Sequence, residues 1–252
     1  MDRFQIHRNL MKAAFAEARA TPSDQRRGLP QPPLEKPRDP NVPLIDLPPP
    51  RDATLVDLSF IDLLERRESR REYSRSPLSQ AELSFLLWAT QGVKKVIRDG
   101  YATMRTVPSG GARHPFETYL VVNRVTGLEP GVYRYIPLGH KLLFLFTDKD
   151  LAGKISSACL GQDFVGSSAA VFIWSVIPYR GEWRYGVAAH KTMLQDIGHV
   201  CQNLYLACEA ISAGTCAIGA YDQAMMDAFL RLDGEDEFVV YAAPVGKVGA
   251  PR

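Results

Sequence analysis

Prolines are concentrated near the start of the chain, where ten of the 18 lie between Pro22 and Pro50. Proline fixes the backbone angle φ and has no N–H to donate, so this stretch cannot form the interior of a helix or a sheet. We therefore expect residues 1–52 to be a proline-rich, extended arm and residues 53–252 to be a separate folded domain. Leu44, Ile45 and Leu47 predict that part of the arm docks on an apolar surface, because a fully solvated linker has no need of them.

The composition is that of an ordinary water-soluble protein, with 46% hydrophobic and 23% charged residues in a chain of 252. The net charge of +2 is too small to indicate nucleic acid as the main partner. No stretch approaches the roughly 20 apolar residues that a membrane span requires, and the N-terminus lacks the apolar core of a signal peptide. We expect a cytoplasmic protein that binds neither nucleic acid nor a membrane.

Cysteine and histidine spacing gives no support for a metal site. The four cysteines form no C-x-x-C pair, and Cys201 and Cys208 fall on one helical face, as buried thiols of a reduced compartment would. The five histidines show no metal-ligand spacing. We therefore expect no bound metal and interpret His199 as a satisfied core histidine.

Local signals after the arm predict a mixture of helices and strands. Ser59 with Asp62, and Ser79 with Glu82, predict two capped helix starts. A long helix is expected from about Ala188 to Ile211, with a wide apolar face formed by Met193, Ile197, Val200, Leu204, Ala207 and Ile211. Strands are expected at Glu117–Asn123, Val132–Ile136, Leu142–Phe146, Ala170–Ile177, Cys216–Tyr221 and Phe238–Val245, with a short helix capped by Asp222 between the last two. The absence of a strict βαβ rhythm argues against a doubly wound fold.

Five arginines lie between Arg66 and Arg75, around Ser69. A guanidinium group offers paired donors and keeps its charge, so arginine with serine is suited to holding a phosphate. Lys247 follows a glycine near the other end of the chain and would close such a site if the fold brings it there. The alternative is a solvated helix end, where cations favour the C-terminal dipole. Glutamates interleaved with the arginines argue against a nucleic-acid patch.

Two glycine-containing segments are candidates for close backbone approach to a ligand: Arg105–Pro115, with Gly110 and Gly111, and Ala213–Tyr221. Each is also compatible with an ordinary turn. The chain has no G-x-S-x-G, G-x-G-x-x-G or Walker-type loop, which argues against α/β-hydrolases, Rossmann dehydrogenases and nucleoside triphosphatases.

A series of short motifs follows one another between about Phe60 and Lys247. They are Arg67-Glu68-Ser69-Arg70-Arg71-Glu72-Tyr73, Pro77-Leu78-Ser79, Leu86-Leu87-Trp88-Ala89-Thr90-Gln91-Gly92, Arg105-Thr106-Val107-Pro108-Ser109-Gly110-Gly111-Ala112, Gly127-Leu128-Glu129-Pro130-Gly131-Val132-Tyr133, Asp196-Ile197-Gly198-His199, Gln202-Asn203-Leu204, Gly214-Thr215-Cys216-Ala217-Ile218-Gly219 and Pro244-Val245-Gly246-Lys247. Each is weak alone, but in this order they resemble the FMN-dependent nitroreductase superfamily. The closer resemblance is to its SagB-type branch, which includes azoline dehydrogenases of peptide natural-product pathways.

The resemblance implies an α+β fold with a central, mostly antiparallel sheet flanked by helices, stable only as a homodimer with FMN at the subunit interface. It implies that Arg67, Ser69 and Lys247 contact the FMN phosphate and ribityl chain, and that Arg71 is a cation near the pyrimidine end. It places Pro108, Ser109 and Gly110 at the ring edge or ribityl chain, and Ile218 and Gly219 where a backbone N–H faces flavin N5. Given a homodimer, our hypothesis is that Leu44–Leu47 docks on the partner subunit.

The sequence departs from the azole-forming members ahead of the long helix, where they carry a Lys-Tyr pair and this chain has Trp183-Arg184-Tyr185-Gly186. Arginine cannot act as a base near neutral pH, whereas Tyr185 could relay a proton. We therefore predict an FMN oxidoreductase with Gly219, Tyr185 and Arg71 as its catalytic positions, which uses NAD(P)H to reduce nitro, quinone or other small organic acceptors. The alternatives are an azoline dehydrogenase acting on a peptide and a non-catalytic flavin-binding partner subunit.

Overall fold

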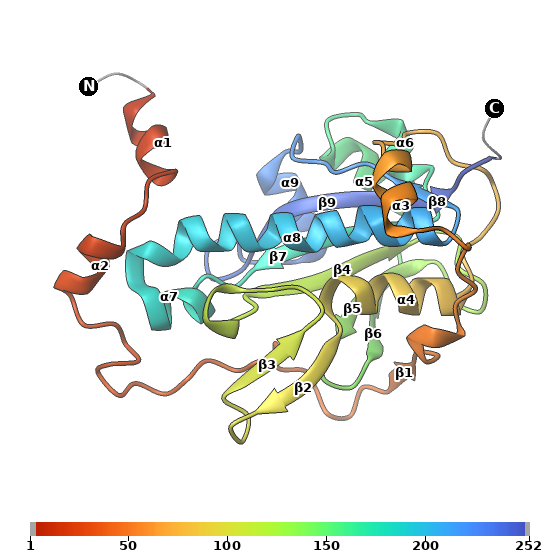
Figure 1. The fold of residues 1–252 in the computed structure, drawn as a ribbon. Helices are drawn as coiled ribbons and strands as arrows, with labels where there is room; N and C mark the ends of the chain where they lie inside the picture. Colours follow the sequence, from red (N-terminus) through yellow and green to blue (C-terminus); the bar gives the residue numbers. More distant parts are fainter. Residues whose placement is uncertain (1–3, 250–252) are drawn as a thin grey trace.

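The computed structural model describes residues 4–249 and contains one large sheet of seven strands (Figure 1). The strand order is β1-β6-β5-β4-β7-β9-β8, and every neighbouring pair is antiparallel. The strands are β1 (Leu44–Asp46), β4 (Phe116–Val122), β5 (Gly131–Ile136), β6 (Lys141–Phe146), β7 (Ala170–Val176), β8 (Ala213–Thr215) and β9 (Phe238–Lys247). With helices on both faces, this is the expected α+β fold.

Each face of the sheet has its own apolar core. The helices α4 (Gln80–Gln91) and α8 (Ala189–Ala210) cover one face, and their buried side chains form a single cluster with Phe172, Trp174 and their neighbours. The helices α5 (Leu151–Ala158), α6 (Asp163–Gly166) and α9 (Gln223–Leu230) cover the other face. In Figure 1 α8 runs along the sheet, so residues on its successive turns are spread from one end of the molecule to the other.

Local capping explains where the helices begin. Ser59 and Ser79 each form a complete capping box, with Asp62 and Glu82, at the starts of α3 (Phe60–Arg66) and α4. Asp222 accepts a hydrogen bond from the Met225 N–H at the start of α9. These three predicted starts are confirmed.

The wide apolar face of α8 is covered by the chain itself. Its six apolar residues are all at most 7% exposed: Met193, Ile197, Val200, Leu204, Ala207 and Ile211. The outward side of the helix instead carries exposed Leu194, Gly198, His199 and Gln202. No partner subunit is needed to cover this face, because α4 and the sheet do so. The exposed position of His199 also corrects its interpretation as a core residue.

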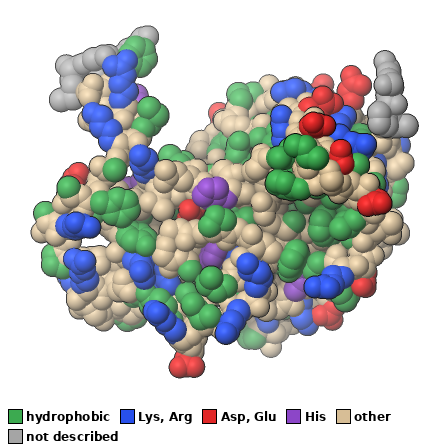
Figure 2. Space-filling model, in the orientation of Figure 1, with side chains coloured by type: hydrophobic (Ala, Val, Ile, Leu, Met, Phe, Trp, Pro, Cys, Tyr) green, Lys and Arg blue, Asp and Glu red, His purple; other side chains and the backbone are tan. Residues whose placement is uncertain are grey.

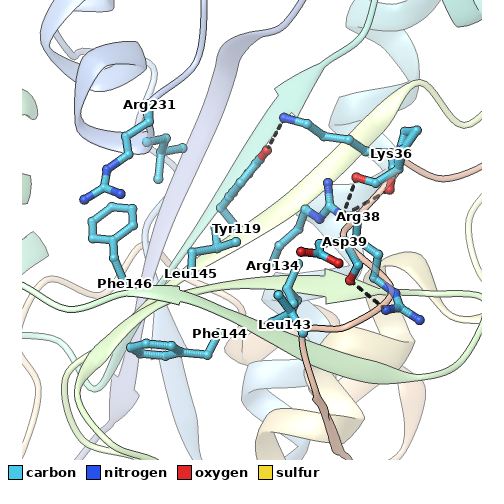
Figure 3. Close-up of a pocket in the computed structure, with 13 residues that line it drawn as sticks. Lys36, Arg38, Asp39, Tyr119, Arg134, Leu143, Phe144, Leu145, Phe146 and Arg231 are labelled. Carbon is cyan, nitrogen blue, oxygen red and sulfur yellow. Dashed lines mark hydrogen bonds between the residues drawn. The ribbon is translucent and has the colours of Figure 1, made fainter.

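The arm docks on its own chain. β1 pairs with β6, with Leu44 opposite Leu143 and Ile45 opposite Leu142, which corrects the hypothesis that this segment docks on a partner subunit. Earlier in the arm, Lys36 donates from Nζ to Tyr119 Oη over 3.1 Å (Figure 3). The same Nζ also donates to Glu237.

Several helices and strands were not predicted from the sequence or differ from the prediction. The segment before α8 has no counterpart among the predicted elements and is helical, with α7 (Tyr179–Tyr185) followed by η3 (Gly186–Ala188). The strand expected at Cys216–Tyr221 lies earlier, as β8, and only Ile218 forms an isolated bridge to Ala242. The remaining elements are α1 (Gln5–Leu10), α2 (Phe15–Ala20), η1 (Pro50–Asp52), the hairpin β2 (Val93–Ile97) and β3 (Ala102–Arg105), and η2 (Gly110–Ala112). Within residues 4–249, no helix combines the length and apolarity that a membrane crossing requires.

Candidate functional site

Arg67 and Ser69 meet at Tyr205, near the C-terminal end of α8. The hydroxyls of Ser69 and Tyr205 are 2.9 Å apart, and the Arg67 guanidinium carbon lies 5.5 Å from the centre of the Tyr205 ring. Tyr205 Oη also accepts a hydrogen bond from the Ala217 N–H over 2.8 Å. Among the residues that the structure describes, Arg67 forms no ion pair. An uncompensated guanidinium beside a serine hydroxyl is a fitting site for a phosphate.

Lys247 reaches the same end of α8, but its ammonium has other partners. It ends β9 opposite Ala213 of β8, and its backbone oxygen accepts the Ser74 N–H. Its Nζ donates to Glu82 of α4 and to the backbone oxygen of Ile211. The fold thus brings Lys247 next to the segment that carries Ser69, without a contact from Nζ to Arg67 or Ser69. Glu82, expected only as a capping residue, also holds this lysine.

Two other arginines of the cluster, Arg70 and Arg71, have partners elsewhere. Arg70 lies between Glu68, at 2.8 Å, and Glu209, at 3.4 Å. Burial raises the pKa of the Glu209 carboxyl, and the adjacent Arg70 opposes that rise. Arg71 lies over the Phe164 ring of α6, with 5.9 Å to the ring centre. The structure therefore does not bring Arg71 to Arg67 and Ser69.

The Ser109–Gly110 loop is held against the N-terminal half of α8. The Gly110 N–H donates to Asp196 Oδ2 over 2.9 Å, and Ser109 Oγ accepts the His114 N–H, while Pro108 is exposed. Burial raises the pKa of Asp196, whereas hydrogen bonds from Ser109 and Gly110 lower it. A Cβ at Gly110 would lie 2.3 Å from Thr192 Cγ2, so only glycine allows this approach.

Tyr185 and Arg184 lie beside the same loop, at the end of α7. A Cβ on Gly111 would lie 2.5 Å from Tyr185 Oη and 2.6 Å from Arg184 Nε. Arg184 Nη1 donates to Tyr101 Oη over 2.5 Å. Both residues belong to the helix α7, and both side chains flank this glycine.

Gly219 presents its backbone outward. It is exposed, a Cβ added there would meet nothing within 4 Å, and no hydrogen bond of its N–H occurs among residues 4–249. The Ile218 side chain is buried in the core formed with α5 and α9, so only its backbone could face a ligand. A free N–H at Gly219 is compatible with the predicted approach to a flavin ring.

Several of the predicted ligand contacts of one chain form two groups at different levels of α8, whereas Arg71 belongs to neither. One group surrounds Tyr205 and the other surrounds Asp196, nine residues earlier in the helix. At 1.5 Å per residue the two levels are about 14 Å apart along the axis. Sequence reasoning quoted Asp196 within a motif but gave it no role, and it missed Tyr205. A tyrosine and an aspartate that interrupt an apolar helix were the available signals.

A further cavity of about 380 Å³ lies elsewhere, between the arm, β4 to β6 and α9 (Figure 3). Lys36, Arg134 and Arg231 contribute cations to it. Arg134 is buried, donates to the backbone oxygens of Lys36 and Pro37, and has an Nε without a partner in the described part of the chain. None of the predicted flavin contacts lines this cavity.

A protein-family model matches most of this chain. The model of the nitroreductase family matches residues 64–247, which include every predicted contact from Arg67 to Lys247. The chain belongs to the nitroreductase family. Among nitroreductase relatives, the protein MJ1384 of Methanocaldococcus jannaschii is 34% identical over 193 residues, which cover 77% of this chain and 93% of the relative. The family makes the chain a flavin-dependent oxidoreductase.

Other nitroreductase-like proteins differ more in length or sequence. The trifolitoxin-processing protein TfxB of Rhizobium leguminosarum is 28% identical over 203 residues, which cover 76% of this chain but only 53% of TfxB. A nitroreductase structure from Ralstonia eutropha has a TM-score of 0.66 at 25% identity and covers 88% of this chain and 100% of its own. The NADPH:FMN oxidoreductase of Vibrio harveyi has a TM-score of 0.52 at 16% identity, covering 76% and 72%, and shares the fold.

Proposed function

We propose that this nitroreductase-family protein binds FMN as a homodimer and uses NAD(P)H to reduce nitro, quinone or other small organic acceptors. The observation that carries the proposal is the uncompensated Arg67 beside Ser69 at Tyr205. The Arg67 guanidinium and the Ser69 hydroxyl can both donate to a phosphate, and among the described residues no carboxylate is paired with Arg67.

Lys247 would complete the phosphate contacts if its ammonium group exchanged the Glu82 carboxylate for the phosphate. Its Nζ donates to the Glu82 carboxylate and to a backbone oxygen. The lysine side chain is 23% exposed, so a ligand can reach it. A phosphate dianion competes well for an ammonium group, because both of its charges act at short range. FMN binding would then release Glu82 from the ion pair and leave it in its capping role at Ser79.

The two levels of α8 give a reason for a homodimer. Arg67 and Ser69 lie at the Tyr205 level, whereas Ser109, Gly110 and Tyr185 lie at or before the Asp196 level. Two copies that cross along their exposed α8 surfaces in antiparallel fashion would bring the Tyr205 level of one to the Asp196 level of the other. Gly198 lies between these levels on the exposed side, with nothing within 4 Å of its Cβ position, so two backbones could approach closely there.

Bound FMN supplies two-electron chemistry, taking a hydride from a donor and passing reducing equivalents to an acceptor. The Gly219 N–H would orient the ring at N5, and Arg71 would stabilise negative charge after moving away from Phe164. Tyr185 would relay a proton to the acceptor. Arg184 cannot act as a base, which favours nicotinamide as the hydride donor, because its oxidised form leaves without releasing a proton.

A second candidate is azoline oxidation on a peptide, as in the SagB-type branch. It is favoured by the likeness to TfxB, a trifolitoxin-processing protein. It requires a group that takes a proton from the substrate carbon, and Tyr185 without a neighbouring lysine is a poor base at neutral pH. We therefore rank it second, above a flavin-binding subunit without turnover.

The decisive test is anaerobic mixing of the purified, FMN-loaded protein with NADPH or NADH. The proposal expects the yellow flavin absorbance to bleach and to return when a nitroaromatic or a quinone is added. Sedimentation should show a particle near twice 28.0 kDa. A flavin that NAD(P)H leaves oxidised, together with azole formation from an azoline peptide, would put the second candidate first.

A further inference from the structure

A pocket of about 310 Å³ lies between the N-terminal segment and the end of α7. Three arginines, two aromatic residues and a glutamine give it its character: Arg19, Arg26, Arg184, Phe15, Tyr185 and Gln25. We call it the arginine pocket. No aspartate or glutamate lines it. In Figure 2, basic side chains (blue) lie over α7 and the chain that follows α2.

The arginines of this pocket have no carboxylate partners among the described residues. Two neighbouring acids are engaged elsewhere, since Asp24 binds Arg27 and the Tyr179 hydroxyl and Glu182 binds His190. Glu17 of α2 does not line the pocket. Three neighbouring positive charges repel one another unless an anion is present. The pocket therefore favours a ligand that carries negative charge.

Hydrogen bonds join the two walls of the arginine pocket. The Gln25 N–H donates to the Trp183 backbone oxygen over 2.8 Å, and Gln25 Nε2 donates to Tyr101 Oη over 2.7 Å. Arg184 binds the same tyrosine oxygen from the other side. Trp183 Nε1 in turn donates to the Leu29 backbone oxygen. The arm is thereby positioned against α7 by contacts that hold the pocket open at a defined width.

The aromatic side chains give the pocket an apolar edge. The Phe15 and Tyr185 rings meet edge to face, with 5.9 Å between their centres. Such a pair can receive an additional ring by edge or face contact. Two of its lining residues, Arg184 and Tyr185, also lie beside Gly111, because a Cβ on that glycine would be 2.6 Å from Arg184 Nε and 2.5 Å from Tyr185 Oη. It thus adjoins the loop that, in the proposed function, contacts FMN.

We propose that the arginine pocket receives the acceptor substrate and selects small aromatic carboxylates. This inference rests on the proposed function for its redox step and adds the substrate class. The carboxylate would be held by Arg26 and Arg19 from the arm, with Arg184 opposite, and the ring would lie against Phe15 and Tyr185. A nitro or quinone group on that ring would then point toward Gly111 and the flavin.

The test compares 4-nitrobenzoate with the neutral 4-nitrobenzamide. Each is reduced from nitro to nitroso with consumption of one NADPH and one proton and release of one water. Wild type should prefer the anion in kcat/KM by about 10-fold or more, mainly through KM, since surface-accessible arginines each contribute modestly. The Arg19→Ala/Arg26→Ala double variant should reduce that preference to about 2-fold or less. Arg51→Ala, which removes an exposed arginine far from the pocket, should keep the wild-type ratio.

Binding measured by calorimetry separates this inference from the proposed function. The flavin-loaded protein should bind 4-nitrobenzoate about 5- to 20-fold more tightly than its double variant does, in the absence of NADPH. If NADPH never reduces the bound FMN, the proposed function fails while this binding result can still stand. If FMN cycles normally but both acceptors give equal kcat/KM in wild type and variant, the inference is overturned. The inference is also overturned if the double variant changes only the ratio of kcat/KM with NADPH to kcat/KM with NADH, because the pocket would then bind the hydride donor.

Discussion

Lys36 should hold the arm to the domain, and its replacement by methionine tests this. The Lys36 ammonium meets the Glu237 carboxylate and the Tyr119 hydroxyl, and Glu237 also accepts from Tyr119 and Ser175. The backbone N–H of Lys36 donates to Glu117. Methionine keeps the backbone contacts and most of the side-chain volume, so the substitution isolates the ammonium group.

The expected loss of stability in Lys36→Met follows from how deeply Lys36 and Glu237 are buried. Truncating one partner of a fully buried ion pair costs about 3–5 kcal/mol, because the other charge stays buried and unpaired. The Glu237 side chain is 7% exposed, but that of Lys36 is 35% exposed, so solvent already screens part of the interaction. We expect Lys36→Met to lower the free energy of unfolding by about 2–3 kcal/mol. At about 2–4 °C per kcal/mol for a domain of this size, Tm should fall by about 5–10 °C.

Urea unfolding followed by circular dichroism measures this loss, with Lys94→Met, an exposed lysine of β2, as the matched control. Glu237→Gln and the double variant complete a mutant cycle, in which the coupling energy should exceed about 1 kcal/mol. A loss for Lys36→Met no larger than that of the control, with no coupling to Glu237, would refute the reasoning and show that the arm is held by other contacts.

Three further predictions concern the candidate site and a buried histidine near it. Arg67→Ala should weaken FMN binding about 10- to 100-fold while hardly affecting riboflavin, which lacks the phosphate; equal losses in a fluorescence titration would place Arg67 elsewhere. Gly110→Ala should push the loop away from Thr192 and raise the Kd for FMN, whereas an unchanged Kd would separate this loop from the flavin. Burial lowers the pKa of His114 from 6.5 to about 3, so the unfolded chain binds the extra proton and stability falls as pH drops below about 6.5. His114→Gln should remove about 2 kcal/mol of the stability difference between about pH 7 and pH 5 in urea titrations, whereas His7→Gln, at an exposed position, should leave that difference intact.

Signals that act within a few residues predicted much of this protein. The capping boxes at Ser59 and Ser79, the cap at Asp222 and the apolar spacing of the long helix each depend on neighbours within one or two turns. Strand-like runs of residues similarly located β4, β5, β6, β7 and β9 to within one or two residues. The motifs that indicated the family are also local, since each holds its residue types at fixed spacing.

Tertiary structure alone decided how these pieces meet. No local signal showed that Lys36 would reach Glu237, 201 residues away, or that β1 would extend the sheet on its own chain. The meeting of Ser69 with Tyr205 depends on the parallel bridge between Ser69 and Thr215, and the helical form of α7 depends on its packing between the arm and α8. These contacts form between segments distant in the chain, and their free energy arises only after both segments are in place. Sequence by itself therefore determined the local elements and the family motifs and predicted the flavin contacts, while the fold decided that Ser69 and Gly110 lie at two separate levels of α8.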